Sequence, residues 1–358
     1  MSMENKYIVI LLIATTMLLS ACSSDDSGVQ TVTAGNEPVG KEVRLVSYIS
    51  PLLEKEQSPH AMLSVSSAYT PDKTTNMGVY MLLSVNPETD WASPKLERIT
   101  YNTSTKKWNA YFEVEKNKTF TVYGYMPKTG EMGSTLEKST ADAATLTISN
   151  MKPVTTDDIC IITGVKDTDS GLKEGQFSWS TPMEEIETYN ISLLMDHLYA
   201  AAQFRLKIDA DYASLRTIKL KTMTLSTNKG SVDATVMLTH NDTGASPISS
   251  VTYDASGSSS TADIYNSNEG TALDKTTPLS VNAYFAPGLS SNLTLVSTYD
   301  VYDSKDNLIR QNCTATNKLP NLEAIRGQRV LLNMTVNPTY LYVLSDPDLD
   351  NPTITIGN

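Results

Sequence analysis

Apolar and polar residues alternate with a period of two along much of the chain, which is the pattern of β-strands with one buried face. The first clear example runs from Val43 to Ile49, and the alternation returns at Phe204 to Ile208 and Val330 to Val336. Gly78 to Val85 and Ile159 to Val165 are apolar apart from Ser84 and Thr163, as strands buried on both faces are. No amphipathic helix of ordinary length is expected, so the pattern predicts an all-β protein.

The spacing of strands and turns predicts two β-sandwiches in tandem. Within the first, Phe120 and Val122 are expected on one face of a strand, with Tyr123 and Tyr125 on the other. An acidic, apolar-poor segment from Thr181 to Tyr189 marks the boundary between the two. The expected order is a signal peptide over 1–21, a polar tether over 22–42, an N-terminal sandwich over 43–187, a C-terminal sandwich over 188–337 and a C-terminal strand appendage over 338–358.

The longest apolar run lies near the N-terminus, from Tyr7 to Leu19, and follows Lys6. It is too short for a membrane-spanning helix and ends in small residues, as a cleaved secretory signal does. Cys22 follows Leu19-Ser20-Ala21 directly, which is typical of a bacterial lipoprotein signal. Cys22 is therefore the predicted lipidation site, with acyl chains anchoring the protein at the outer membrane. The alternative is an ordinary signal peptide followed by a chance cysteine.

Composition excludes some classes of protein. The 358 residues carry a net charge of -12, so no basic surface is available to neutralise nucleic-acid phosphates. The hydrophobic content of 40% is enough for real cores. Besides Cys22, the chain has Cys160 in an apolar run and Cys313 in a polar stretch. Two free cysteines are expected, and a disulfide between them is the alternative.

Candidate chemistry is sparse. The sequence has no nucleophile elbow, phosphate-binding loop or dinucleotide fingerprint. His60, His197 and His240 are isolated, with no second histidine or cysteine at ligand spacing, so no metal site is expected, and His197 is interpreted as structural. Asp157-Asp158 and Glu184-Glu185 are interpreted as solvated turn residues, not as a glycosidase pair. We therefore expect no catalytic residue, no cofactor and no enzyme activity.

An acidic turn near the C-terminus partly matches a calcium loop. Asp346-Pro347-Asp348-Leu349-Asp350-Asn351 places aspartates at alternate positions. The glycine of the sixth position is replaced by Asn351, and the twelfth position is Gly357 where a bidentate glutamate is needed. A turn between two strands is the favoured interpretation, with calcium binding as the alternative.

Taken in order, several segments resemble the fimbrillin superfamily, the type V pilins of Gram-negative outer-membrane fimbriae. They are the lipoprotein signal with its acidic tether, the stretch from Trp108 to Pro127 ending Tyr123-Gly124-Tyr125-Met126-Pro127, the stretch from Met195 to Ile208, and the tail from Tyr340 to Pro352. The resemblance implies transthyretin-like sandwiches and assembly at the cell surface. It also implies a protease that cuts after the first strand, and a neighbouring subunit whose strand fills the groove left behind.

One residue departs from this pattern. The family's cut usually follows an Arg just after the first strand, whereas here that position offers Lys55, and the nearby Arg44 lies inside the strand. Lys55 is the favoured processing site and Arg44 the second choice, while an uncut chain would remain a lipid-held anchor or accessory subunit. The predicted strand-donor residues lie in the tail: Tyr340, Leu341, Tyr342, Val343, Leu344, Ile354 and Ile356. Burial of the tail in its own domain is the alternative.

The sequence thus predicts a structural, non-enzymatic subunit of a cell-surface fimbria. Its expected partners are other fimbrial subunits, the outer membrane through Cys22 and a processing protease. The alternative is a surface glycan-binding lipoprotein of a carbohydrate-uptake system, which would need an exposed aromatic platform. Trp91 and Trp179 are the candidates for that platform, although they lie far apart in the chain.

Overall fold

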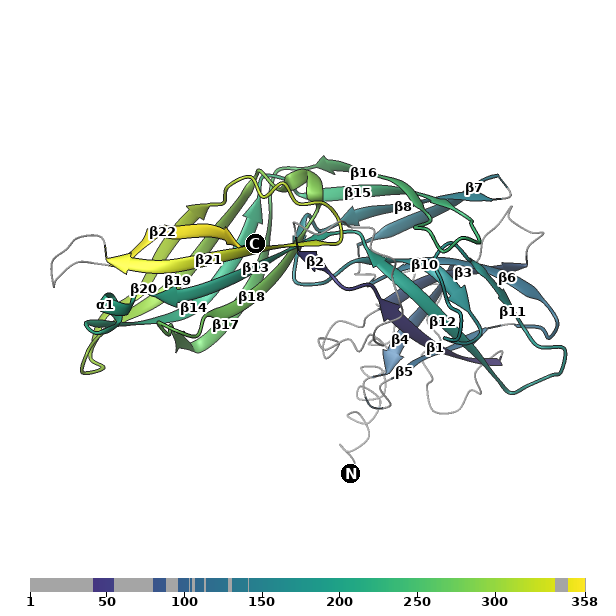
Figure 1. Ribbon diagram of the computed structural model, residues 1–358, viewed down its shortest axis with the longest axis horizontal. Coiled ribbons are helices and arrows are strands. Elements are labelled where there is room, and N and C mark those ends of the chain that lie inside the picture. The colour runs from purple at the N-terminus through teal and green to yellow at the C-terminus, as the bar shows by residue number, and fades with distance from the viewer. Residues whose placement is uncertain are drawn as a thin grey trace, which may run out of the picture. The chain divides into compact units, whose positions relative to one another are not determined.

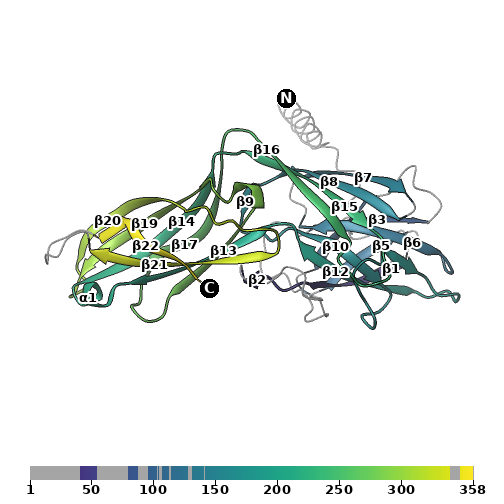
Figure 2. The same cartoon turned by 45° about the horizontal axis from the view of Figure 1, so that its top comes forward.

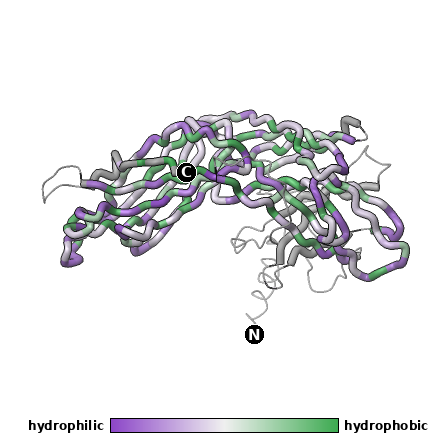
Figure 3. Tube along the Cα trace, viewed as in Figure 1, coloured by the Kyte–Doolittle hydropathy of each residue, from purple (hydrophilic) through white to green (hydrophobic). Residues whose placement is uncertain are grey.

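The structure is a computed structural model that describes residues 41–54, 80–87, 96–102, 104, 107–112, 114–127, 131–140, 142–338 and 347–357. The chain divides into two units, Met1–Pro38 and Val39–Asn358, and every described residue belongs to the second. Strands dominate this unit, which confirms the all-β fold expected from the alternation of apolar and polar residues. Figure 3 shows that alternation as hydrophobic and hydrophilic positions interspersed along the strands.

The first sheet, of which strand β1 is a member, closes on itself. Its order is β10 (Cys160–Lys166), β12 (Thr188–His197), β1 (Lys41–Ile49), β5 (Lys107–Phe112), β4 (Leu96–Asn102), β3 (Tyr80–Pro87), β6 (Thr119–Met126) and β11 (Ser178–Ser180). Because β10 also pairs with β6, the run from β10 to β6 forms a ring. Within it, β1 is parallel to β12 and antiparallel to β5 (Figure 1).

The second sheet packs against one face of the first. Its order is β16 (Ile248–Ser256), β15 (Ser231–Thr239), β8 (Ala143–Met151) and β7 (Gly133–Thr140). Tyr123 and Tyr125 of β6 point into the core shared with this sheet, while Phe120 and Val122 point into the core enclosed by the ring. This confirms the faces that the sequence predicts for β6.

The other two sheets form a sandwich. One contains β2 (Leu53–Glu54), β21 (Gln328–Pro338), β13 (Ala200–Ile208), β18 (Leu279–Phe285) and β9 (Val154–Thr155) in that order, with β22 (Pro347–Gly357) also paired to β21. The second contains β17 (Ser260–Ala272), β14 (Arg216–Thr227), β19 (Leu293–Asp303) and β20 (Leu308–Lys318). Alternate residues of β13 and β21, such as Phe204 and Leu332, fill the core between them. Figure 2 labels strands of both sheets, among them β13 and β21 of the first and β14 and β19 of the second.

Helical structure is minor in the described part of the chain. The short helix α1 (Ala210–Ala213) begins after Asp209, whose carboxylate accepts the backbone N–H groups of Asp211 and Tyr212. A single 3-10 turn, η1 (Pro287–Leu289), precedes β19. No helix among the described residues has both the length and the apolar character needed to cross a membrane.

Strand pairing connects segments that the sequence analysis kept apart. The expected boundary between residues 187 and 188 falls between β11 and β12, which belong to the same sheet. The β7–β8 hairpin also pairs with β15, which comes far later in the chain. The segment from Asn241 to Asn268 contains all of β16 and most of β17, and these two strands join different sheets. Side-chain alternation identifies strands but carries no information on which distant strand becomes the partner.

Candidate functional site: the seats of the two chain ends

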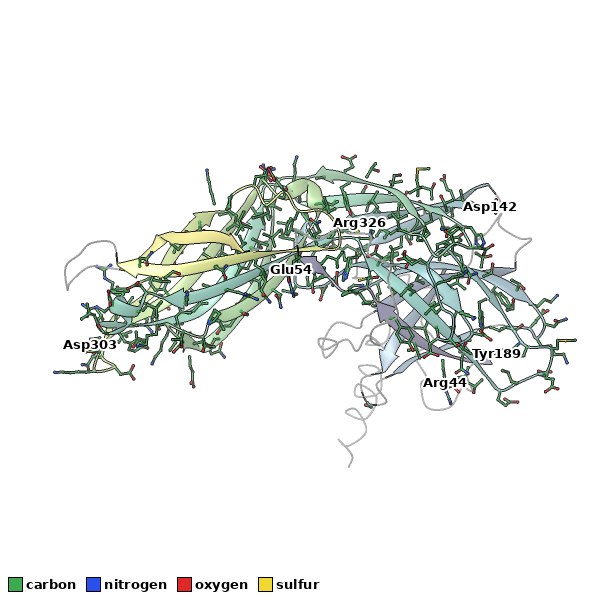
Figure 4. The ribbon with its side chains drawn as sticks, viewed as in Figure 1. Arg44, Glu54, Asp142, Tyr189, Asp303 and Arg326 are labelled. Atoms are coloured by element: carbon green, nitrogen blue, oxygen red, sulfur yellow. The ribbon has the colours of Figure 1, made fainter. Side chains whose placement is uncertain are left out.

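Strand β1 occupies an interior position in the first sheet. Its register pairs Leu45 with Ile191 of β12 on one side and with Trp108 of β5 on the other. Val43 and Leu45 are 1% and 3% exposed and belong to the core within the ring, whereas Val46 is 41% exposed. Figure 4 labels Arg44 and Tyr189 on the adjacent strands β1 and β12. β1 therefore contributes both backbone pairing and side chains to the centre of a core.

The residues that follow β1 are held by two different sheets. Ser50 donates its backbone N–H and its hydroxyl to the carbonyl oxygen of Met195, each at 3.0 Å. The Leu53 N–H donates to the carbonyl oxygen of Gly327 at 2.9 Å, and β2 then runs parallel to the start of β21. The Glu54 carboxylate pairs with the guanidinium of Arg329. The segment from 50 to 54 thus ties the end of β1 to the sandwich sheet.

His197 is the buried side chain that contacts this segment. Its Nε2 lies 2.6 Å from the Ser50 carbonyl oxygen, and its Nδ1 lies 2.8 Å from Oδ2 of Asp158. A carbonyl and a carboxylate can only accept, so both ring nitrogens donate when the imidazole is protonated. Burial by itself would lower the pKa of His197, but the adjacent Asp158 carboxylate, together with Asp196 and the Ser50 carbonyl, raises it overall. His197 therefore connects the end of β1 to the loop before β10.

A second ion pair lies beside His197. Nη1 of Arg326 is 2.5 Å from Oδ2 of Asp196 and 3.3 Å from the His197 carbonyl oxygen. Figure 4 labels Arg326, which precedes β21, and Glu54, which ends β2. This second ion pair connects the end of β12 to the segment that leads into β21, whereas the His197–Asp158 pair connects the end of β12 to the loop before β10.

Glu174 is a buried carboxyl group close to these ion pairs. Burial and the charge of Asp196 raise the pKa of Glu174 to about 7, against the opposing influence of Arg326 and of the Thr163 hydroxyl. Its Oε1 atom is buried and has no hydrogen-bond partner among the described residues. A carboxyl in this setting favours its protonated form below neutral pH.

The C-terminal strand β22 lies on an outer edge, in contrast to β1. Among the described strands it pairs with β21 alone, in antiparallel register, with Ile356 opposite Leu332 and Ile354 opposite Met334. Ile354 is half-buried against the sandwich core, and Ile356 is 39% exposed. The pairing of β22 uses Leu331 to Pro338 of β21, whereas β2 uses Gln328 and Arg329 of the same edge. β2 and β22 therefore lie along the same edge of β21.

The candidate residues from the sequence fall partly outside the described residues. This applies to the lipidation site Cys22, to Lys55, to Trp91 and Asp346, and to the donor residues Tyr340, Leu341, Tyr342, Val343 and Leu344. Arg44 lies within β1, where its exposed guanidinium pairs with Glu42 at 3.1 Å. Ile354 and Ile356 lie in β22 and pair within their own chain. This is the arrangement that the alternative for the tail describes, and donation to a neighbour stays a prediction.

The structure tests three other interpretations made from the sequence, which concern the two cysteines, Asp158 and Trp179. Cys160 and Cys313 are not joined by a disulfide, as expected. Asp158, interpreted as solvated, is only 13% exposed and contacts His197, so that interpretation is wrong. Trp179 is buried at 1% exposure in the ring's core, which makes it unavailable for a glycan-binding platform. The aromatic residue was misassigned because β11 is only three residues long and its alternation is too short to detect.

Sequence reasoning missed the group formed by Ser50, Asp158, Cys160 and His197. Its members come from the end of β1, the loop before β10, the start of β10 and the end of β12. The antiparallel pairing of Cys160 with His197 brings them together across 37 residues of sequence. The short spacing of Asp158 and Cys160, at the entrance to a buried strand, was the one local signal available.

Of the comparisons with known proteins, the one with solved structures gives matches, and those with family models and with curated proteins do not. A protein of Bacteroides fragilis assigned to cell adhesion is 11% identical, with a TM-score of 0.42, covering 89% of this chain and 97% of that one. A fimbrial protein from Bacteroides vulgatus is 14% identical, with a TM-score of 0.34 and coverage of 88% and 99%. A fimbrial anchor protein from Porphyromonas gingivalis is 10% identical, with a TM-score of 0.29 and coverage of 87% and 95%. The chain is similar to each of these three solved structures over most of its length.

Proposed function

We propose that this protein is a structural subunit of a cell-surface fimbria, exported as a lipoprotein and assembled by exchange of strands between subunits. The observation that carries the proposal is the contrast between the two chain ends. β1 fills an interior position bordered by strands on both sides, and β22 is an edge strand bound on one side only. We call the position of β1 between β12 and β5 the seat of β1; when β1 is absent, an extended strand from another subunit can fill it. β22 is a strand that can leave its own sheet and supply this contact.

The seat of β1 has the properties of an acceptor groove. Removing β1 would leave the backbone N–H and C=O groups of β12 and β5 unpaired along facing edges. It would also open the core positions now filled by Val43 and Leu45. An extended donor strand restores both kinds of contact, and each docked aliphatic side chain contributes about 1.5–3 kcal/mol of burial.

The tail supplies a suitable donor. Ile354 and Ile356 are two residues apart, so they lie on the same face of an extended strand. In an acceptor groove they would fill alternate positions, as Val43 and Leu45 do in β1. Tyr340 to Leu344 would extend the donated segment and place further apolar residues along the groove.

Processing of the precursor would begin next to β2. Lys55 directly follows Glu54, the last residue of β2, whereas Arg44 lies inside a strand that is paired on both sides. A protease requires an extended and accessible segment, which favours Lys55 over Arg44. A chain that escapes cleavage would keep β1 and remain attached through lipid on Cys22, as an anchor or accessory subunit at the outer membrane.

The test is assembly in cells that express the protein. Unboiled gels and electron microscopy should show a high-mass ladder and filaments for the wild type. A chain lacking residues 340–358 should give folded monomer without a ladder. A matched control, Ile325→Ala, alters an exposed apolar residue outside both seats and should assemble normally. Normal ladders from the truncated chain would overturn donation by the tail.

N-terminal sequencing of the assembled protein separates the two routes. A mature chain that begins just after Lys55 supports cleavage and exchange. A chain within the polymer that still begins at acylated Cys22 contradicts that route and supports the anchor role. Labelled fatty acid should be incorporated into the wild type and not into Cys22→Ala, and equal labelling of both would refute the lipid anchor.

A further inference from the structure

The group that holds Ser50 has the composition of a metal site. Asp158, Cys160 and His197 each offer one ligand atom, and these atoms all lie within 4.8 Å of one another. Cys160 is fully buried and His197 is 3% exposed, so both are removed from bulk water. We propose that these three side chains bind one divalent metal ion of the zinc type. The inference rests on this geometry and is independent of the proposed fimbrial function.

The imidazole is already oriented as a ligand. The Nε2 atom of a metal-bound histidine commonly donates to a carbonyl oxygen when Nδ1 binds the ion, and that bond fixes the tautomer. Here Nε2 donates to the Ser50 carbonyl at 2.6 Å, which leaves Nδ1 facing the other two ligands. Nδ1 is 2.8 Å from Oδ2 of Asp158 and 3.8 Å from Sγ of Cys160.

These distances fit a tetrahedral ion after a small adjustment. Zinc binds sulfur at about 2.3 Å and histidine nitrogen at about 2.0–2.1 Å, so their ligand atoms are about 3.5–3.6 Å apart. The Sγ to Nδ1 distance of 3.8 Å is close to this. The Asp158 oxygen must retreat from Nδ1 by roughly 0.5 Å to reach tetrahedral spacing. Asp158 lies in the loop between β9 and β10, where such a shift moves no strand.

The carboxylate of Asp158 has an unused oxygen. Its Oδ1 atom is buried and has no hydrogen-bond partner among the described residues. An unpaired buried carboxylate oxygen is costly, and the positive charge of a nearby metal ion lowers that cost. One oxygen of Asp158 with Sγ and Nδ1 supplies three donor atoms, which leaves the fourth tetrahedral position open to a water or another ligand. Nitrogen, sulfur and oxygen together are a ligand set that suits zinc.

The charges of the three ligands match that of a divalent ion. A thiolate, a neutral imidazole and a carboxylate together carry two negative charges, which offset the two positive charges of the ion. The occupied site is therefore electrically neutral, which lowers the cost of burying the ion.

Metal binding would strengthen the attachment of β1. A metal on Nδ1 fixes the proton on Nε2, and that proton donates to Ser50, the residue directly after β1. The same ion joins the loop before β10 to the start of β10 and the end of β12. The site thus connects three segments around the exit of β1.

Titration of the full-length protein with cobalt tests the site. Cobalt(II) substitutes for zinc and gives a thiolate-to-metal charge-transfer band only when sulfur is a ligand. We expect one equivalent of cobalt to produce this band, and zinc to displace it. Cys160→Ala should abolish the band, whereas the matched control Cys313→Ala should retain it.

A second variant separates metal binding from folding. The side-chain amide of His197→Gln can still donate to Ser50 but offers no imidazole nitrogen to the metal, so this variant should fold without binding cobalt. Zinc should raise the Tm of the wild type and leave that of His197→Gln unchanged. No charge-transfer band in the folded wild type, or a band that survives Cys160→Ala and disappears in Cys313→Ala, would overturn the proposal.

Discussion

β1 and β22 lie at opposite ends of the described chain and are bound in different ways. β1 has a strand on each side and places Val43 and Leu45 in a core. β22 has a strand on one side, with Ile354 half-buried and Ile356 largely outside. The comparison teaches that similar lengths of strand can differ greatly in how firmly they are held. An edge strand can detach while its sheet stays intact, whereas loss of an interior strand opens the sheet.

The largest expected effect is truncation of a side chain in β1. Leu45→Ala should lower the free energy of unfolding by about 2–5 kcal/mol, because it leaves a cavity in the core within the ring. Chemical denaturation of the purified protein measures this. Val46→Ala, on the exposed face of the same strand, is the matched control and should change stability by less than about 0.5 kcal/mol. Equal effects of the two substitutions would contradict the interior placement of β1.

Loss of the His197 side chain should have the next largest effect. His197→Ala removes the donor to Ser50 and leaves the half-buried Asp158 carboxylate without its partner. We expect a loss of about 2–4 kcal/mol in the presence of a chelator. Limited proteolysis should also cut the segment around residues 50–54 sooner than in the wild type. His240→Ala is the control, since His240 lies at the surface near Asp242, and its proteolysis pattern should not change.

Deletion of the tail should be milder than either change to the seat of β1. Removing residues 347–358 takes away the one-sided pairing of β22 and the partial burial of Ile354. The expected loss is about 1–3 kcal/mol, with a cooperative thermal transition retained. A deletion that prevents folding would show that β22 is as essential as β1 and would remove the contrast between the two ends.

The pH dependence of stability should show a smaller effect, centred on Glu174. Its pKa is raised to about 7 from the usual 4.5, so the folded state binds this proton more tightly than the unfolded state does. Its contribution is therefore fully present below about pH 4.5, falls as pH rises to about 7, and is constant above that. Glu174→Gln should flatten this part of the profile by about 1–2 kcal/mol. Unfolding titrations at a series of pH values measure it, and an unchanged profile would mean that Glu174 is ionised in the folded protein.

The sequence was sufficient for the strands and their faces. Alternation correctly predicts the inward face of β21 and the two faces of β6, because burial of one side imposes a period of two. It could not predict that β12 joins the sheet of β1, or that β8 pairs with β15. Pairing between distant strands depends on register and packing, which leave no mark in either strand alone.

The candidate site was less predictable than the fold. His197 and Cys160 are 37 residues apart, and their proximity follows only from the pairing of β10 with β12. Ser50 joins them because β1 is parallel to β12 and ends at the same level. The isolation of each histidine in the sequence led to the expectation of no metal site. Ligand spacing along the chain is informative only when the ligands share one element or one hairpin.

The shared edge of β21 has a consequence for solubility. β21 is eleven residues long, and its outer side is covered in part by β2 and in part by β22. An uncovered edge presents a row of unpaired N–H and C=O groups that can join the same edge of another molecule. β2 and β22 thus protect this edge against side-by-side aggregation, and a fragment that lacks either strand exposes part of the edge.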